Sequence, residues 1–112
     1  MLNFELHTES EGSSALVSVR GDFDLQVAKQ VADALTEVES TEPDLLVFDL
    51  SRLSFMDSTG MGVIAAAHLR ANEASRRFVI VMPPAGVRQA FEVSGLDKVV
   101  TSVEDLASVY PR

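Results

Sequence analysis

An acid, two hydroxyls and two glycines lie close together in the stretch FMDSTGMG, residues 55–62. Asp57, Ser58 and Thr59 stand between the apolar run LLVFDL and the stretch MGVIAAAHLRA, which is typical of a helix. In open α/β sheets, ligand sites lie beyond the carboxyl ends of the strands, so the position suits a functional site. Four roles are open: helix capping, nucleophilic catalysis, phosphorylation of the aspartate, and phosphorylation of a hydroxyl.

Helix capping is the simplest of these roles. Asp, Ser and Thr are preferred N-cap residues because their side chains accept hydrogen bonds from the free N–H groups of the first turn. Gly60 permits a close approach of the backbone. One capping residue is enough to start a helix, however, so three polar residues with two glycines exceed that need.

Catalysis by Ser58 has little support. The stretch partly matches the G-x-S-x-G nucleophile motif, but Met56 stands at the first glycine position. Of the two histidines, His7 belongs to a predicted edge hairpin, and His68 lies about 15 Å further along the predicted helix axis. Since neither is placed to act as the general base, we expect that the protein is not an enzyme.

Phosphorylation of Asp57 is excluded because the acids and the lysine that it requires are not at the required positions. Such a receiver site needs an acidic pair after the first strand to hold Mg²⁺, and a Lys after the last strand. The first predicted strand ends in HTES, and Lys98 precedes the valines of the last one. The chain also lacks P-loop and dinucleotide-binding glycine motifs, and two isolated histidines do not make a metal site. We therefore expect no cofactor and no metal.

A phosphorylated hydroxyl fits this position better. Ser58 lies at a predicted helix N-terminus, where backbone N–H groups and the helix dipole favour an added anion. A phosphate there brings nearly two negative charges close to Asp57. At an effective dielectric of about 20, like charges about 6 Å apart repel by roughly 3 kcal/mol before salt screening, and every 1.4 kcal/mol is tenfold in affinity. Phosphorylation of Ser58 would therefore weaken an interface by two or more decades.

Length and charge limit the partners. With 112 residues we expect one domain, residues 1–112, and a net charge of −8 disfavours binding to nucleic acid or anionic lipid. The chain contains no Cys, no apolar run long enough for a membrane span and no signal-peptide pattern at its start. These features favour a cytoplasmic protein. The expected state is a monomer or a weak dimer, since the exposed first strand, residues 2–7, can pair between chains and its alternating polar residues protect it only weakly.

Apolar periodicity predicts an α/β fold with a mixed sheet of four to five strands and about four helices. Residues 2–7 and 15–19 alternate as strands of an N-terminal antiparallel hairpin, with a turn over residues 10–14 and a break at Gly21. Residues 45–50 and 78–82 are continuous apolar runs, typical of strands in the centre of a parallel sheet. The short last strand is predicted at residues 98–100.

Four helices are predicted between and after these strands. Asp24 caps the first, Pro83 and Pro84 open the third and Gly95 closes it, and Ser102 with Asp105 resembles a capping box for the last. The predicted apolar faces consist of Ala28, Val31, Ala32, Leu35 and Val38 in the first helix, Met61, Ile64, Ala65 and His68 in the second, Val87, Ala90 and Phe91 in the third, and Leu106, Val109 and Tyr110 in the last.

Three segments together resemble one family. They are RGDFDLQVA at residues 20–28, VFDLSRLSFMDSTGMGVI at residues 47–64 and VRQAFEVSGLDKVV at residues 87–100. In order and spacing they are similar to the bacterial anti-sigma-factor antagonists, single-domain members of the STAS superfamily, and the resemblance extends along essentially the whole chain. It implies a regulator of transcription, as in stress response or sporulation.

The resemblance implies a partner-switching mechanism. The unphosphorylated antagonist binds an anti-sigma factor that is itself a serine kinase, and so releases the sigma factor. The kinase phosphorylates the Ser after the motif Asp, here Ser58, which ends the interaction, and a serine phosphatase restores it. Thr59 replaces a second Ser of some members and is a secondary candidate acceptor, while Asp57 and Gly60 match the acid and the turn glycine.

The resemblance also places Gly21 and Asp24 near the partner-binding surface. Asp22 and Phe23 depart from the Glu and the aliphatic residue that are frequent there, which leaves the partner's identity open. Phe23, Met56 and Met61 are apolar side chains that serve either as contact area or as core. An alternative to partner switching is a STAS module that is not phosphorylated and belongs to a transporter or a larger signalling assembly.

Overall fold

The computed structural model describes residues 3–110, which form one mixed sheet with helices packed on it. Strands β1 (Phe4–Glu11), β2 (Ser14–Phe23), β3 (Leu45–Met56), β4 (Arg77–Val81) and β5 (Thr101–Val103) lie in the spatial order β1-β2-β3-β4-β5. β1 is antiparallel to β2, and the other neighbouring pairs are parallel. The predicted α/β class and N-terminal hairpin are confirmed, whereas Leu2 lies outside the described residues.

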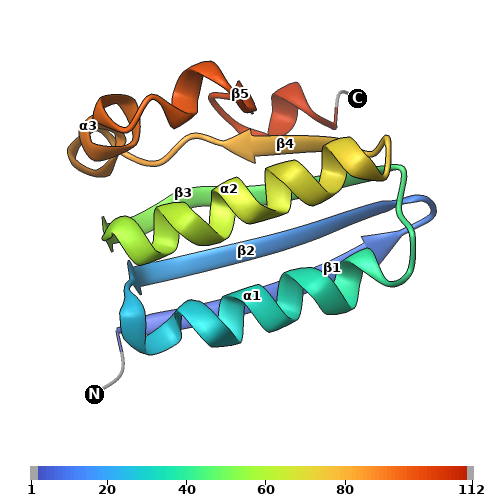
Figure 1. The fold of residues 1–112 in the computed structure, drawn as a ribbon, viewed down its shortest axis with the longest axis horizontal. Coiled ribbons are helices and arrows are strands. Elements are labelled where there is room, and N and C mark those ends of the chain that lie inside the picture. Colours follow the sequence, from blue (N-terminus) through green and yellow to red (C-terminus); the bar gives the residue numbers. More distant parts are fainter. Residues whose placement is uncertain (1–2, 111–112) are drawn as a thin grey trace.

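Helices α1 (Leu25–Glu39) and α2 (Ser58–Glu73) lie side by side on one face of the sheet (Figure 1). Both begin at the edge of the sheet where β2 and β3 end, because each follows its strand after a single capping residue. α3 (Ala85–Val93) follows β4 after three residues, Met82, Pro83 and Pro84. The carboxyl edge of the parallel strands therefore collects the N-termini of three helices.

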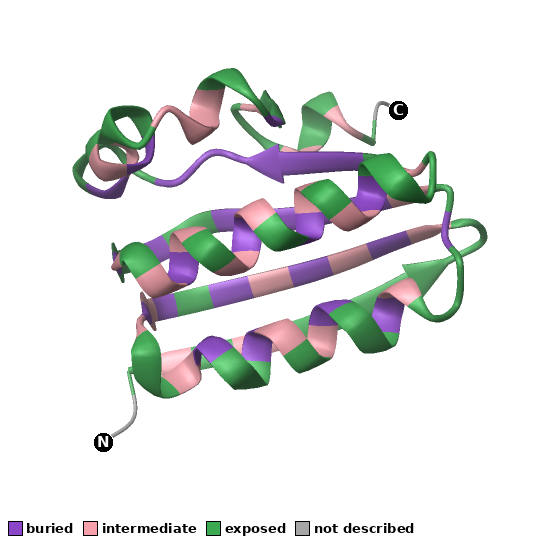
Figure 2. Cartoon of the chain, viewed as in Figure 1, coloured by how far each residue is buried: buried purple, intermediate pink, exposed green. Residues whose placement is uncertain are grey.

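The core lies between the sheet and its helices. Alternate residues of β2 are buried, while β4 is buried along nearly its whole length (Figure 2). In α1 the predicted stripe is correct for Ala28, Val31, Leu35 and Val38, and Ala32 is half-buried. In α3, Val87 and Phe91 are buried as predicted, and Ala90 is half-buried.

Of the predicted apolar stripe of α2, only Ile64 is fully buried. The other buried residues are Gly60, Ala67 and Ala71, while Met61, Ala65 and His68 are half-buried. α2 carries small or apolar residues almost all around its first three turns, so its periodicity does not identify one face. Packing against the sheet selected the face.

Several predicted boundaries were wrong. β2 continues through Gly21, which has a φ of +95° beside a register shift, and β3 continues to Met56, beyond the predicted end at Leu50. Residues 96–98 form a 3₁₀ turn, so the last strand begins at Thr101 instead of Lys98. The last predicted helix is a 3₁₀ turn, Leu106–Ser108, capped by Asp105 alone.

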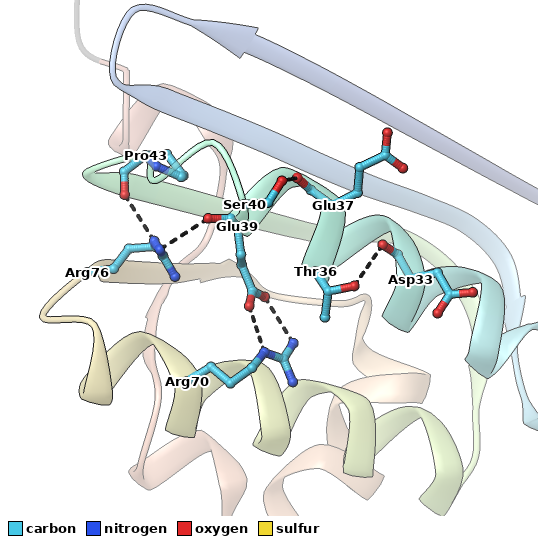
Figure 3. Close-up of polar contacts among 8 residues, drawn as sticks. All are labelled: Asp33, Thr36, Glu37, Glu39, Ser40, Pro43, Arg70 and Arg76. Atoms are coloured by element: carbon cyan, nitrogen blue, oxygen red, sulfur yellow. Dashed lines mark hydrogen bonds and ion pairs between the residues drawn. The ribbon is translucent and has the colours of Figure 1, made fainter.

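A polar cluster joins the C-terminal ends of α1 and α2 (Figure 3). The guanidinium of Arg70 donates two hydrogen bonds to the carboxylate of Glu39, of 2.6 and 2.9 Å, and the hydrogen bonds raise the pKa of Arg70 above its ordinary value. Nε of Arg76 donates a 3.0 Å hydrogen bond to the carbonyl of Pro43. The cluster fixes the two helices at the end opposite Asp57.

Candidate functional site

Asp57 is the N-cap of α2. Its Oδ1 accepts hydrogen bonds from the backbone N–H groups of Thr59 at 2.9 Å and Gly60 at 3.1 Å. Asp57 is therefore the capping residue of this stretch, and the cap of α2 involves no hydroxyl.

The second oxygen of Asp57 reaches the other helix. Oδ2 accepts a 3.2 Å hydrogen bond from the backbone N–H of Leu25, the first residue of α1. α1 also has its own cap, since Oδ1 of Asp24 accepts from the N–H of Gln26 at 3.0 Å. One carboxylate therefore binds the positive ends of two helices, each of which favours negative charge.

Ser58 is the first residue of α2, and it is exposed. Among residues 3–110 its hydroxyl takes no part in the capping of α2, which Asp57 supplies. Thr59 is half-buried and contributes its N–H to the cap. Ser58 therefore presents the more accessible hydroxyl of the two.

Gly60 allows α2 to pack closely on the ends of β2 and β3. A Cβ at this position would stand 2.9 Å from the carbonyl oxygen of Phe23 and 2.9 Å from Cγ of Met56. Gly60 lies inside the first turn of α2, so its role is close packing and not a turn. Gly62, by contrast, has open space where a Cβ would be.

The apolar residues expected at this edge are mainly core residues. Phe23 is 0 % exposed and packs edge-to-face against Phe48 with ring centroids 6.1 Å apart, and Met56 is 5 % exposed. Met61 is half-buried and packs against the core. Of these three, Met61 alone retains surface that a partner can touch, while Phe23 and Met56 support the edge from within.

Gly21 is buried and serves the fold. Its Cβ would stand 2.0 Å from the carbonyl oxygen of Asn3, which accepts a 2.9 Å hydrogen bond from the N–H of Asp22. The position therefore requires glycine for both its positive φ and its contact with the N-terminal segment. Asp24, three residues later, is half-buried at the start of α1.

Two exposed apolar side chains near this edge were missed by the sequence reasoning. Leu25 is 73 % exposed at the start of α1, and Phe55 is 51 % exposed next to buried Met56. The alternation of strand residues signals Phe55, because neighbours in a strand point to opposite faces. The sequence pattern did not indicate that Leu25 is exposed. Leu25 stands three residues before Ala28, and this helical spacing predicts a residue on the buried face.

The histidines lie away from Ser58. Nε2 of His7 is 2.9 Å from a Glu9 oxygen on β1, and Nε2 of His68 is 3.3 Å from Nδ2 of Asn72, one turn later in α2. Within residues 3–110 no group of three or more His, Cys, Asp or Glu side chains is arranged to hold a metal ion. In the same range, no helix has the length and hydropathy needed to cross a membrane.

Comparisons with known proteins agree on one family. A family model described as "Mlab, STAS domain" matches residues 6–102. The anti-sigma-F factor antagonist RsfB of Mycobacterium tuberculosis is 33% identical over 84 residues, which cover 75% of this chain and 68% of RsfB. The anti-sigma-B factor antagonist of Listeria monocytogenes is 30% identical over 84 residues, which cover 75% of this chain and 74% of that protein.

A solved structure is similar over nearly the whole chain. The crystal structure of an anti-sigma factor antagonist from Mycobacterium paratuberculosis superposes with a TM-score of 0.85 at 27% sequence identity, and the match covers 94% of this chain and 89% of the other. This chain therefore belongs to the STAS domain family, and its similar members include anti-sigma factor antagonists.

Proposed function

We propose that this protein is an anti-sigma factor antagonist that acts by partner switching. In its unphosphorylated form it binds an anti-sigma factor that is a serine kinase, and the sigma factor is released. The kinase transfers a phosphoryl group from ATP to the hydroxyl of Ser58, and the phosphoprotein dissociates. A serine phosphatase hydrolyses the phosphoserine and restores binding. The names of the relatives support the general role.

The observation that carries this proposal is that Asp57 caps α2 while the hydroxyl of Ser58 is exposed and does not take part in the cap. Asp57 caps α2 with its carboxylate, so the neighbouring hydroxyl is exposed and is not needed to hold the helix. Modification of Ser58 therefore leaves the cap in place. The charge of the surface changes while the fold is kept.

The effect of the phosphate is electrostatic. A phosphoserine carries nearly two negative charges, and the start of α2 accommodates them through its dipole. A partner that binds the unmodified edge meets Asp57 and Asp24, and it needs basic groups to match them. The added phosphate changes the charge and the shape of that contact, and it repels Asp57 across a short distance.

The proposed contact surface consists of the accessible residues around Ser58. From the family pattern it includes Asp24, Asp57, Ser58, Thr59 and Met61. We add Leu25 and Phe55, because an exposed apolar side chain supplies more binding free energy than a charged rim residue. Gly21, Phe23, Met56 and Gly60 are assigned an indirect role, since they are buried and shape the edge.

Intact-mass measurement tests the proposal. The protein is incubated with ATP, Mg²⁺ and each candidate serine kinase encoded in its own genome, and the modified peptide is mapped. We expect the mass of one phosphate on Ser58, absent in Ser58→Ala and retained in Thr59→Val. Ser58→Ala is expected to bind the kinase without being released by ATP.

Two results would contradict the proposal. One is a phosphate that forms at the same rate on Ser58→Ala. The other is no phosphate with any candidate kinase together with a stable complex with a membrane transporter or a signalling assembly, which would identify an unphosphorylated STAS module. Covalent labelling of Ser58 by an activated phosphonate would instead indicate an esterase, and we expect none.

A further inference from the structure

The sheet has a cleft of about 420 Å³ over β1, β2 and β3. Its lining includes Leu16, Ser18 and Arg20, which alternate along β2 with core residues packed under α1. Because neighbours in a strand point to opposite faces, the cleft lies on the face away from α1 and α2. Leu106, from the turn after β5, forms an apolar wall.

A buried carboxylate lines this cleft. Asp49, in the middle of β3, is 7 % exposed and is the buried charged residue of the part of the chain that the structure describes. Its Oδ1 accepts a 2.9 Å hydrogen bond from the N–H of Ser51. Among residues 3–110, its Oδ2 has no hydrogen-bond partner. This oxygen is not fully buried, so it remains accessible to a ligand. The accessible part of Asp49 therefore opens into the cleft.

A bulge in β3 brings two arginines to the same place. Ser18 of β2 pairs with Asp49, but Arg20 pairs with Arg52, so β3 contains one extra residue between these points. A bulge re-aims the side chains that follow it, and here it places Arg52 beside Arg20 at the cleft. Arg20 is 3.3 Å from Glu5, whereas Arg52 forms no ion pair with another residue of the described range 3–110.

We propose that this cleft binds a small zwitterion, namely an α-amino acid with an apolar side chain. Its ammonium group pairs with the free oxygen of Asp49, and its carboxylate pairs with the guanidinium of Arg52, which presents two parallel N–H donors. Its side chain packs against Leu16 and Leu106. The cleft lies within the size range of small-molecule sites, and its lining combines leucines with charged and polar side chains.

The charges of the cleft select against simpler ions. An anion alone leaves the buried Asp49 unpaired and meets the repulsion of Asp49 and Glu5, and a cation alone meets the two arginines, of which Arg20 is paired with Glu5. Only a ligand with both charges pairs both kinds of side chain. The residues that line the cleft do not include Ser58. The test of ligand binding in the cleft is therefore independent of the test of partner switching.

Titration calorimetry on the full chain tests the proposal with four probes: L-leucine, 4-methylpentanoate, isopentylamine and inorganic phosphate. We expect saturable binding of L-leucine, and binding of each of the other three at least about tenfold weaker, since a charge-assisted hydrogen bond contributes more than the 1.4 kcal/mol that corresponds to tenfold. Amide chemical-shift changes are expected at Ser18, Asp49 and Arg52.

Two variants locate the site. Asp49→Asn keeps an oxygen for the N–H of Ser51 but removes the charge, and Arg52→Gln changes an exposed side chain. Each is expected to weaken L-leucine binding at least about tenfold, whereas Arg77→Gln, outside the cleft, is expected to leave it unchanged. Equal binding of phosphate and L-leucine, no binding of L-leucine, or binding unaffected by Arg52→Gln would each overturn the proposal.

Discussion

The backbone N–H of Leu25 donates a 3.2 Å hydrogen bond to Oδ2 of Asp57, which lies 32 residues further along the chain. The same carboxylate caps α2 through Thr59 and Gly60. The starts of α1 and α2 are thus coupled through one side chain at the surface proposed for partner binding. Removal of this side chain affects both helices, which leads to a first prediction.

Asp57→Ala is expected to lower the free energy of unfolding by about 2 kcal/mol, since it removes three hydrogen bonds to a charged acceptor. Asp24→Ala is the matched control, because it removes the single hydrogen bond that the Asp24 side chain accepts at the start of α1 and is expected to cost about 1 kcal/mol. Urea denaturation followed by circular dichroism measures both values. Equal losses for the two variants would show that the additional bonds of Asp57, including the bond to Leu25, contribute nothing.

Gly60→Ala and Gly62→Ala are expected to have opposite effects on stability. At Gly60 the new methyl group meets Phe23 and Met56 at 2.9 Å, so we expect a loss of about 1–3 kcal/mol from overpacking. At Gly62 the methyl group has open space, and we expect a gain of up to about 1 kcal/mol from helix propensity. Thermal and urea unfolding measure the two changes. A neutral Gly60→Ala would argue against close packing of α2 on β2.

The pair of Glu39 and Arg70 is expected to stabilise the far ends of α1 and α2. The Glu39 side chain is 10 % exposed, so Arg70→Ala leaves a largely buried carboxylate without its partner and is expected to cost about 1–3 kcal/mol. Lys29→Ala is the control, because the pair of Lys29 with Asp33 is solvent-exposed, and no measurable change is expected. Similar midpoints of urea unfolding for the two variants would contradict this prediction.

The contribution of Arg70 to the free energy of unfolding is expected to depend on pH only in the alkaline range. Glu39 raises the pKa of Arg70 above its ordinary value, so the contribution of the charged arginine is present at all lower pH values and is lost only as pH rises through the raised pKa. The difference in unfolding free energy between wild type and Arg70→Ala is therefore expected to stay constant between neutral pH and about pH 10. A difference that shrinks in this window would assign the contribution to another group.

Ser58→Asp is expected to separate binding from folding. The new carboxylate gains from the dipole of α2 and is repelled by Asp57, so the free energy of unfolding is expected to change by less than about 1 kcal/mol. Affinity for the partner kinase is expected to fall at least about tenfold, while Ser58→Ala retains it. Surface plasmon resonance and urea unfolding on the same samples provide both readouts. Wild-type affinity of Ser58→Asp would contradict the electrostatic account.

The exposed apolar residues of the edge are expected to contribute to partner binding without contributing to stability. Leu25→Ser and Phe55→Ser are expected to weaken binding of the kinase at least about tenfold each. Leu69→Ser is the control, because Leu69 is 61 % exposed but lies about three helical turns after Ser58 in α2, away from the proposed contact surface. Equal affinities for the three variants would exclude Leu25 and Phe55 from the interface.

Much of the fold was predictable because its signals are local. The continuous apolar runs of β3 and β4 identify central strands, and Asp24, Asp57 and Gly95 stand where a helix begins or ends for reasons of residue type. The errors have local causes as well. The end of β3 was placed too early because Ser51 and Arg52 interrupt the apolar pattern, although the strand continues past them through a bulge.

The sequence by itself determined the central strands, the starts of the three helices and the acidic residue next to a serine, because cap preference and apolar periodicity act over a few residues. The tertiary structure decided the contacts between distant residues. The N–H of Leu25 donates to Asp57, Phe23 and Met56 lie in the core, and Arg52 pairs with Arg20 across β2 and β3. These contacts depend on the register of neighbouring strands and on the face that each helix buries. A single extra residue in a strand reverses the direction of the side chains after it, and this shift depends on pairing with a distant strand.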